Sequence, residues 1–425
     1  MKQARARLLR VALVPAVIVA VSLVHAGSAH AATWCGTPAT SDRTPQASAG
    51  YSVHLVYAVP ADGADQLAAK WGSAMQTDAE TIDAWWRRED PTRTVRFDTF
   101  AFPCGTQLDI TFVRLPGAGA TLDRIGSRFQ LIYNALLATS LLTPYEKTVL
   151  YYDGPDNQGR PTVCGQGGGL VAFVYVNACD GVPNDGTVAH ELLHALGAVP
   201  AGAPHDCPPP DSAHTCDTET DIMYPYANGA NLFALLLDPG RDDYYGHSGS
   251  WWDVQDSQFL ARLDAQTPLS VTVQGSGRVV SDIPGVDCTA ACASQWNTGT
   301  AVALTATPTN GQRLIRWSGG CSGAVETCTV SLAQTTAVTA LFAPSTFGLR
   351  VSVSGKGAVR GAGGLVSCPA QCRASVSSYT PARLVATPAA GWRFKAWSGA
   401  CRGSRPTCTV PMKQASSARA TFVRK

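Results

Sequence analysis

A histidine pair with a glutamate beside its first member is the strongest chemical signal in this 425-residue sequence. His190 and His194 are four residues apart, and Glu191 directly follows His190. On a helix this spacing puts both imidazoles on one face, one turn apart, so that both can bind a single tetrahedral zinc ion. The glutamate then projects beside the metal, where it can act as general base toward a metal-bound water. The pattern predicts a zinc-dependent hydrolase.

A second motif follows this expected helix. Gly197 stands three residues after His194 and suits the left-handed turn that ends a helix. Further along the chain is a turn sequence, Asp221-Ile-Met223-Tyr224-Pro. HExxHxxG followed by such a turn resembles the metzincin clan of zinc endopeptidases, over residues 33–267. The resemblance implies that Met223 forms a hydrophobic floor below the zinc, and it makes Tyr224 a candidate for stabilising a developing oxyanion.

The third zinc ligand departs from the metzincin pattern. The clan's third ligand stands six residues after the second histidine, and here that position is Pro200, whose side chain cannot bind metal. We expect His205 to replace it, because it is the first donor after the turn and a Cys207–Cys216 disulfide could anchor it. His214 is the next candidate. The remaining candidates are acidic: Asp206, Asp217 and Glu219.

Hydrophobic periodicity predicts the elements that must position these residues. Alternating apolar residues predict strands near 53–59, 95–100, 108–113, 148–152 and 170–177. Apolar residues at helical spacing predict helices near 67–86, 122–136, 185–197 and 254–263. The domain is therefore expected to be α+β, a twisted mixed sheet with helices that leads to the metal-binding helix.

The N-terminal segment predicts export. Four basic residues precede an apolar stretch from Val11 to about His25, and small residues follow up to Ala31. We expect residues 1–31 to be a cleaved signal peptide and the mature protein to be secreted. Beyond this segment no stretch of 18 or more residues is apolar, which excludes a membrane span, and a hydrophobic content of 45% excludes intrinsic disorder.

Fourteen cysteines in an exported chain predict disulfides. In residues 32–267 the expected pairs are Cys35–Cys104, Cys207–Cys216 and Cys164–Cys179, the last bracketing a loop at 165–169. In the C-terminal part we expect local pairs, since each small module must be stapled without help from its neighbour. These are Cys288–Cys292, Cys321–Cys328, Cys368–Cys372 and Cys401–Cys408. A zinc knuckle built from the four cysteines of one module is the alternative.

The C-terminal part is a tandem repeat. The spacing within its first four cysteines recurs in its last four, and Trp317 recurs as Trp397 at the same offset. Each copy, 268–344 and 345–425, alternates apolar and polar residues in its last strand, which predicts two small all-β modules. These features resemble the divergent relatives of the internalin B-repeat family, which implies a stalk or adhesion role.

Charge divides the chain in the same places. Residues 32–267 hold 13 basic and 28 acidic residues, a net charge of −15, the first repeat is neutral, and the second holds 13 basic residues and no acidic ones. The basic module is expected to bind an anionic polymer such as cell-wall teichoic acid, to fold back on the acidic domain, or simply to be a solvated face. No nucleic-acid-binding motif is present, so nucleic acid is not an expected partner.

Two functions remain open. The first is a secreted zinc endopeptidase that cleaves protein or peptide substrates and uses its repeats for attachment to a surface or substrate. The second is a catalytically inactive surface or adhesion protein, favoured by Pro200 and opposed by the presence of Glu191. The substrate and the control of latency are not predicted.

Overall fold

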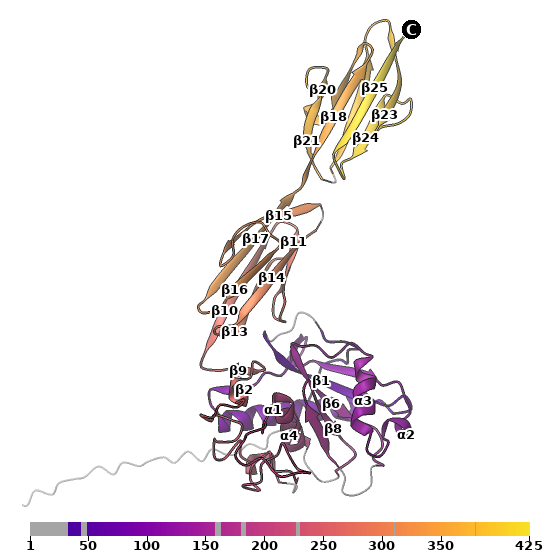
Figure 1. Cartoon of the computed structure of the whole chain (residues 1–425). Coiled ribbons are helices and arrows are strands. Elements are labelled where there is room, and N and C mark those ends of the chain that lie inside the picture. The colour runs from indigo at the N-terminus through magenta and orange to yellow at the C-terminus, as the bar shows by residue number, and fades with distance from the viewer. Residues whose placement is uncertain are drawn as a thin grey trace, which may run out of the picture.

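The computed structural model describes residues 33–43, 49–157, 163–179, 184–226, 230–309, 311–378 and 380–425. The expected signal peptide, residues 1–31, lies outside the described residues. An α/β unit comes first, and two β modules follow it in sequence order (Figure 1). The described part is therefore mixed α and β with all-β modules at its C-terminal end, as expected. Within it, no helix has both the length and the apolar character needed to cross a membrane.

A five-stranded sheet in the order β5-β1-β6-β8-β7 forms the centre of the first unit. Strands β5, β1, β6 and β8 run parallel, and β7 pairs antiparallel with β8 at the edge. Every residue of β1 is buried, as is typical of a parallel strand covered on both faces. The strands are β1 Ser52–Val59, β5 Ile110–Arg114, β6 Glu146–Tyr152, β7 Gly165–Gly168 and β8 Val171–Tyr175.

Helices cover both faces of this sheet. A π-helical turn, Leu67–Trp71, leads into α1, Gly72–Glu89, which shares one hydrophobic core with α4, Asn184–Leu196. Helix α3, Arg128–Leu137, and the short α2, Gly119–Leu122, pack on the other face.

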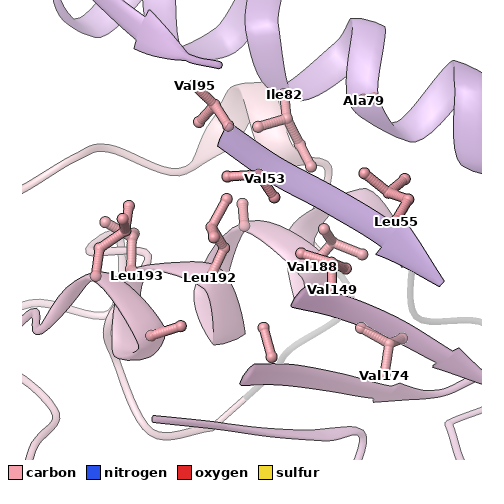
Figure 2. Packing of buried hydrophobic residues seen from close by; sticks show 14 of the residues in the cluster. Val53, Leu55, Ala79, Ile82, Val95, Val149, Val174, Val188, Leu192 and Leu193 are labelled. Carbon is pink, nitrogen blue, oxygen red and sulfur yellow. The ribbon is translucent and has the colours of Figure 1, made fainter. Parts of the chain in front are cut away.

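Apolar side chains of α1 and α4 meet the central strand (Figure 2). Val53 and Leu55 of β1 point toward this layer, and the helices contribute Ala79, Ile82, Val188, Leu192 and Leu193. All five of these helical side chains are nearly or completely buried. The core therefore fixes α4, and with it the backbone of the histidine motif, against the rigid centre of the sheet.

Four expected elements differ in the structure. The helix expected at 122–136 is interrupted, because α2 ends at Leu122 and α3 begins at Arg128, and Ile125 between them is 71% exposed. The strand expected at 95–100 is two short strands, β2 Arg93–Val95 and β3 Thr99–Phe102, and β3 forms a hairpin with β4, Gly105–Leu108. The expected loop at 165–169 is largely strand β7.

The prediction of a helix at 254–263 is also wrong. This segment is a 3₁₀ turn, Val254–Asp256, followed by strand β9, Leu260–Arg262, which pairs with β2. The side chain of Asp253 accepts a hydrogen bond from the backbone N–H of Gln255, so a local turn replaces the helix. Another 3₁₀ turn, Leu232–Ala234, lies earlier in the same region.

The two C-terminal modules have the same topology. Each consists of two four-stranded sheets, ordered β13-β10-β17-β15 and β12-β11-β14-β16 in the first module and β21-β18-β25-β23 and β20-β19-β22-β24 in the second. The first comprises β10 Gln266–Gln274, β11 Gly277–Ser281, β12 Asp287–Cys288, β13 Ala291–Asn297, β14 Ala301–Pro308, β15 Gln312–Gly319, β16 Thr327–Ser331 and β17 Thr336–Pro344. The second comprises β18 Thr346–Ser354, β19 Gly357–Gly361, β20 Ser367–Cys368, β21 Arg373–Ser377, β22 Pro381–Pro388, β23 Trp392–Gly399, β24 Thr407–Pro411 and β25 Ser416–Arg424, with a 3₁₀ turn at Ala362–Gly364. The predicted pair of all-β modules is confirmed.

Seven disulfides use all fourteen cysteines, and the expected pairing is confirmed throughout. The α/β unit holds Cys35–Cys104, Cys164–Cys179 and Cys207–Cys216. Each β module holds one pair four residues apart and one pair seven residues apart. The cysteines of the modules are therefore staples and not a zinc knuckle.

Candidate metal centre

Helix α4 carries the histidine motif and ends directly after it. Gly197 has φ +90°, its N–H donates to the carbonyl of His194, and the N–H of Ala198 donates to the carbonyl of Leu193. This pair of hydrogen bonds around a left-handed glycine is the Schellman end of a helix. Because Gly197 reverses the chain one turn after His194, the following loop can return to the histidine face.

Three histidines converge at this face. The Nε2 atom of His194 lies 3.2 Å from Nε2 of His190 and 3.2 Å from Nε2 of His214. All three offer nitrogen atoms within 4.8 Å of one another. Three nitrogens bound to a tetrahedral zinc at 2.0–2.1 Å stand about 3.3 Å apart, so the observed spacing fits a single zinc ion.

The second ring nitrogens explain why these Nε2 atoms are free to bind metal. Nδ1 of His190 lies 2.6 Å from the carbonyl oxygen of Ile222, and Nδ1 of His214 lies 3.1 Å from the carbonyl oxygen of Asp211. A carbonyl only accepts, so Nδ1 carries the proton in both rings and the Nε2 lone pairs point into the cluster. The facing lone pairs of His190 and His214 can both bind a cation that lies between them and His194. The donor set therefore fits a zinc ion.

Burial keeps the helical pair neutral. Desolvation lowers the pKa of His190 to about 4, and desolvation together with the neighbouring rings lowers the pKa of His194 further. Neutral imidazole is the form that binds metal.

The side chain of Glu191, on α4, lies against the edge strand β7. Only 7% of it is exposed, and burial raises its pKa to about 8. Its side chain lies against β7, because a Cβ added to Gly165 would come within 2.7 Å of the Glu191 carboxylate oxygen Oε1. A Cβ on Gly167 would overlap the carbonyl oxygen of Glu191 itself. The glycines of β7 thus allow the edge strand to approach the helix at Glu191.

A disulfide loop carries the third histidine. Cys207 and Cys216 close it, the N–H of Cys207 donates to the carbonyl of His214, and the N–H of Cys216 donates to the carbonyl of His205. The N–H of Thr215 donates to the carbonyl of Met223. The loop is therefore tied both to itself and to the turn at 221–224.

The turn at 221–224 supports the cluster from a third direction. Met223 is completely buried, and its N–H donates to Oδ1 of Asp221, which also accepts from the hydroxyl of Tyr244. Ile222, between them, supplies the carbonyl that binds His190. The turn thus contacts both the helix and the disulfide loop.

His205 is placed elsewhere. Its N–H donates to Oδ1 of Asp243, and its ring Nδ1 lies 2.9 Å from Oδ2 of the same carboxylate, which raises the pKa of this exposed histidine. Its neighbours are Asp217 and Asp243 and not the other histidines.

The expected set of His190, His194 and His205 is therefore not the set that the structure brings together. Asp243, from a distant part of the chain, holds His205, and the disulfide loop presents His214 instead. The acidic candidates Asp206, Asp217 and Glu219 do not join the cluster either.

One tyrosine, Tyr224, ends the turn, and a second, Tyr226, follows it. The ring of Tyr224 is half-buried and lies 6.0 Å from that of Tyr226, which is 63% exposed. The hydroxyl of Tyr226 donates to the carboxylate of Asp211, on the loop that carries His214. The sequence pattern singled out Tyr224 and gave no signal for Tyr226. It gave no signal for β7 either, because Gly165-Gln-Gly-Gly contains none of the residues that favour strands.

Comparison with known proteins identifies the C-terminal modules. The model of the divergent InlB B-repeat domain matches residues 267–346 and 357–425, in agreement with the resemblance noted in the sequence. No match was found among curated proteins.

The solved structures that resemble this chain do so weakly. Wild-type OgpA from Akkermansia muciniphila is 12% identical, with a TM-score of 0.32 over 71% of this chain and 99% of OgpA. Catalytically inactive OgpA in complex with an O-glycopeptide substrate, glycodrosocin, is 9% identical, with a TM-score of 0.30 over 92% and 100% of the two chains. The Bacillus anthracis TIE protein is 8% identical, with a TM-score of 0.26, and this chain spans only 35% of its length. TM-scores this low assign neither a fold nor an activity to the chain.

Proposed function

We propose that this protein is a secreted zinc endopeptidase of the metzincin type. The observation that carries the proposal is the convergence of three histidine Nε2 atoms at the helix that also carries the buried Glu191. His190, His194 and His214 would hold the metal. A zinc ion there would polarise a water molecule and the scissile carbonyl group.

Glu191 is the general base of the proposed reaction. It accepts a proton from the attacking water as the water oxygen forms a bond to the carbonyl carbon. When the carbon–nitrogen bond breaks, Glu191 returns the proton to the leaving amine. Burial keeps this carboxyl group away from bulk water, and its raised pKa favours holding a proton between the two steps.

Strand β7 is the proposed binding site for the substrate backbone. It stands at the edge of the sheet and pairs only with β8 among the described strands. An extended peptide can add to such an edge through main-chain hydrogen bonds. Because Gly165 lies against Glu191, a peptide on β7 would pass close to the general base.

Secretion and attachment complete the proposal. Seven disulfides suit an oxidising extracellular environment, and the two B-repeat modules are suited to hold the enzyme at a surface or on a substrate. Because the second module is basic, its proposed partner is an anionic polymer, such as one of the cell wall.

Metal content and proteolysis, measured together, test the catalytic proposal. The secreted parent should hold about one zinc per chain and cleave unfolded casein. Glu191→Ala should keep the zinc and lose activity by roughly 10²–10⁴-fold. His214→Ala should lose both zinc and activity.

His205→Ala is the matched control, because it removes another histidine from the same part of the chain. It should keep both properties. A parent without zinc after metal-replete preparation, or a zinc-loaded parent inactive on every unfolded substrate, would support the inactive surface protein instead. Loss of zinc in His205→Ala with zinc kept in His214→Ala would overturn the assignment of the third ligand.

A further inference from the structure

The second β module carries positive charge that no acidic side chain of the module neutralises. All thirteen of its lysines and arginines are exposed, and its sequence from 345 to 425 contains no acidic residue. Among the described residues, no ion pair involves a side chain of this module. The charges therefore face solvent without acidic partners in the described part of the protein.

Strand register gathers three of these arginines on one outward face. In the sheet β21-β18-β25-β23, Arg350 of β18 stands directly opposite Arg373 of β21. Arg350 also pairs with Ser417 of β25, and Arg419 lies two residues further along the same strand. Residues two apart in a strand point to the same side, so Arg419 is the diagonal neighbour of Arg350. We call Arg350, Arg373 and Arg419 the arginine face.

A surface hollow lies at this face. It has a volume of about 350 Å³, and its lining includes Arg350, Arg373 and the serines Ser416 and Ser417. Guanidinium groups form paired hydrogen bonds with oxyanions, and the hydroxyl of the exposed Ser417 can donate to the same group. The lining therefore suits an anionic group of the ligand.

The first module shows that the fold does not need these arginines. At the equivalent positions of the repeat it has Ser270, Ala293 and Thr339. These residues occupy the same register, since Ser270 pairs with Ala293 and Thr272 pairs with Thr339. The same sheet is thus built with neutral side chains at all three positions.

The arginine face is, in addition, unfavourable for the module by itself. Like charges directly opposite each other on neighbouring strands destabilise a sheet. In the first module Arg278 of β11 is paired with Asp287 of β12, whereas the corresponding positions of the second module are Ala358 and Ser367. An anionic ligand would neutralise the charges that the second module leaves without acidic partners.

We infer that the arginine face of the second B-repeat module binds a linear polyanion whose repeating units carry phosphate or carboxylate groups. The inference rests on the attachment role proposed above for the repeats, and it does not depend on peptidase activity. A polymer fits better than a small anion, because further exposed cations, Arg393 and Lys395 of β23, lie on the same sheet.

Polymer binding by the full secreted chain tests this inference. The chain carries Glu191→Ala, so that binding is measured without proteolysis and failure of the catalytic proposal cannot affect the result. The probe is fluorescently labelled poly(glycerol phosphate), followed by fluorescence anisotropy over a range of salt concentrations. Polygalacturonate is the second probe and distinguishes carboxylate from phosphate as the recognised group.

The variant exchanges the arginine face for the residues of the first module: Arg350→Ser, Arg373→Ala and Arg419→Thr. We expect at least tenfold weaker binding. The slope of log affinity against log salt concentration should also become less steep by about 2, since three fewer counterions are released. Its melting temperature should not fall, because the same residues support the same sheet in the first module.

The matched control removes three charges outside the arginine face: Arg402→Ser, Arg405→Val and Lys413→Ala, again the residues of the first module. These positions lie in the turns that flank β24. The control should keep most of the affinity. The reverse exchange, Ser270→Arg, Ala293→Arg and Thr339→Arg, should strengthen binding by adding a second face.

Three results would overturn the inference. One is equal loss of binding in the control and the arginine-face variant, which would show that binding depends on net charge alone. Another is unchanged binding in the arginine-face variant together with no gain in the reverse exchange. The third is binding to vesicles of anionic lipid while neither soluble polymer binds, which would make a membrane the partner.

Discussion

At the residue scale, the candidate metal centre depends on hydrogen bonds that orient its side chains. His190 is oriented by the carbonyl of Ile222, and that carbonyl is held in place by a turn built around Asp221. Asp221 is 1% exposed, and burial raises its pKa to about 7. One buried carboxyl group therefore supports both the turn and the tautomer of a proposed ligand.

Replacement of Asp221 by alanine should weaken zinc binding. The N–H of Met223 and the hydroxyl of Tyr244 would both lose their acceptor, the turn would loosen, and we expect roughly a 10–100-fold loss of zinc affinity, the range typical of outer-shell changes. Competition with a zinc chelator measures the affinity. Tyr244→Phe, which removes only one of the two hydrogen bonds, should have a smaller effect. If Asp221→Ala bound zinc as tightly as the parent, the turn would not contribute to zinc binding.

Asp78 of α1 should make stability depend on pH. Burial raises its pKa from 3.8 to about 7, although the hydroxyl of Tyr151 donates to it. The folded state therefore holds this proton more tightly than the unfolded state, and stability falls as pH rises from about 4 through 7. Asp78→Asn should stabilise the protein at pH 8 by about 2–4 kcal/mol and should change little at pH 4.

Guanidinium unfolding at the two pH values measures the effect. Glu80→Gln is the control, because it removes an exposed carboxylate from the same helix. The same pH dependence in Asp78→Asn and the parent would show that another group is responsible.

At the element scale, the close approach of β7 to α4 connects the edge of the sheet to the helix that carries the histidine motif. The approach requires glycine, since a side chain on Gly167 would meet the backbone of Glu191 and the Cβ of His194. A residue with a side chain would have to push the strand away from the helix. The element that we propose to bind substrate is thus placed by residues that have no side chain.

Gly167→Ala should therefore reduce both stability and activity. The added Cβ forces β7 and α4 apart, and we expect a loss of about 1–3 kcal/mol in the free energy of unfolding, the usual range for overpacking. Gly186→Ala is the control on α4, where an added Cβ meets nothing within 4 Å. It should stabilise the helix by about 0.5–1 kcal/mol. If the two substitutions had the same effect, the close approach would not constrain the site.

At the scale of the whole molecule, the first β module is attached to the α/β unit by specific contacts. Oδ1 of Asn297 accepts from the guanidinium of Arg96 and from the N–H of Arg262, and its Nδ2 donates to the carbonyl of Leu260. Ala49 of the α/β unit lies in the core of the module. These contacts hold the first module on the α/β unit, and the second module follows it (Figure 1).

Asn297→Ser should loosen this attachment. The substitution introduces the residue at the equivalent position of the second module, Ser377. It removes the acceptor of Nη2 of the buried Arg96, whose Nη1 still donates to the carbonyl of Tyr51, at a cost of about 1–3 kcal/mol. Calorimetry should show the first module unfolding separately from the α/β unit, and proteases should cut faster between Arg262 and Gln266. Ser377→Ala is the control in the second module. A single transition in both the parent and Asn297→Ser would mean that other contacts carry the attachment.

The sequence by itself determined the features that depend on local spacing. The separation of His190 and His194 places both on one helix face whatever the rest of the fold does, and Gly197 predicted where the helix ends. The constant offset between the two copies revealed both modules, and the short separations of their cysteines decided the pairing. These features involve residues close in the chain or exact repetition, so no knowledge of distant contacts was needed.

Only the tertiary structure decided which residue joins the histidine pair. His205 and His214 lie close together in the sequence, and no local rule distinguishes them. The choice depends on Asp243, which holds His205, and on the turn at 221–224, which ties the disulfide loop to α4. The edge strand β7 was hidden for the same reason: its glycines favour no element by themselves, and a strand forms there because β8 provides its hydrogen bonds and α4 leaves no room for side chains.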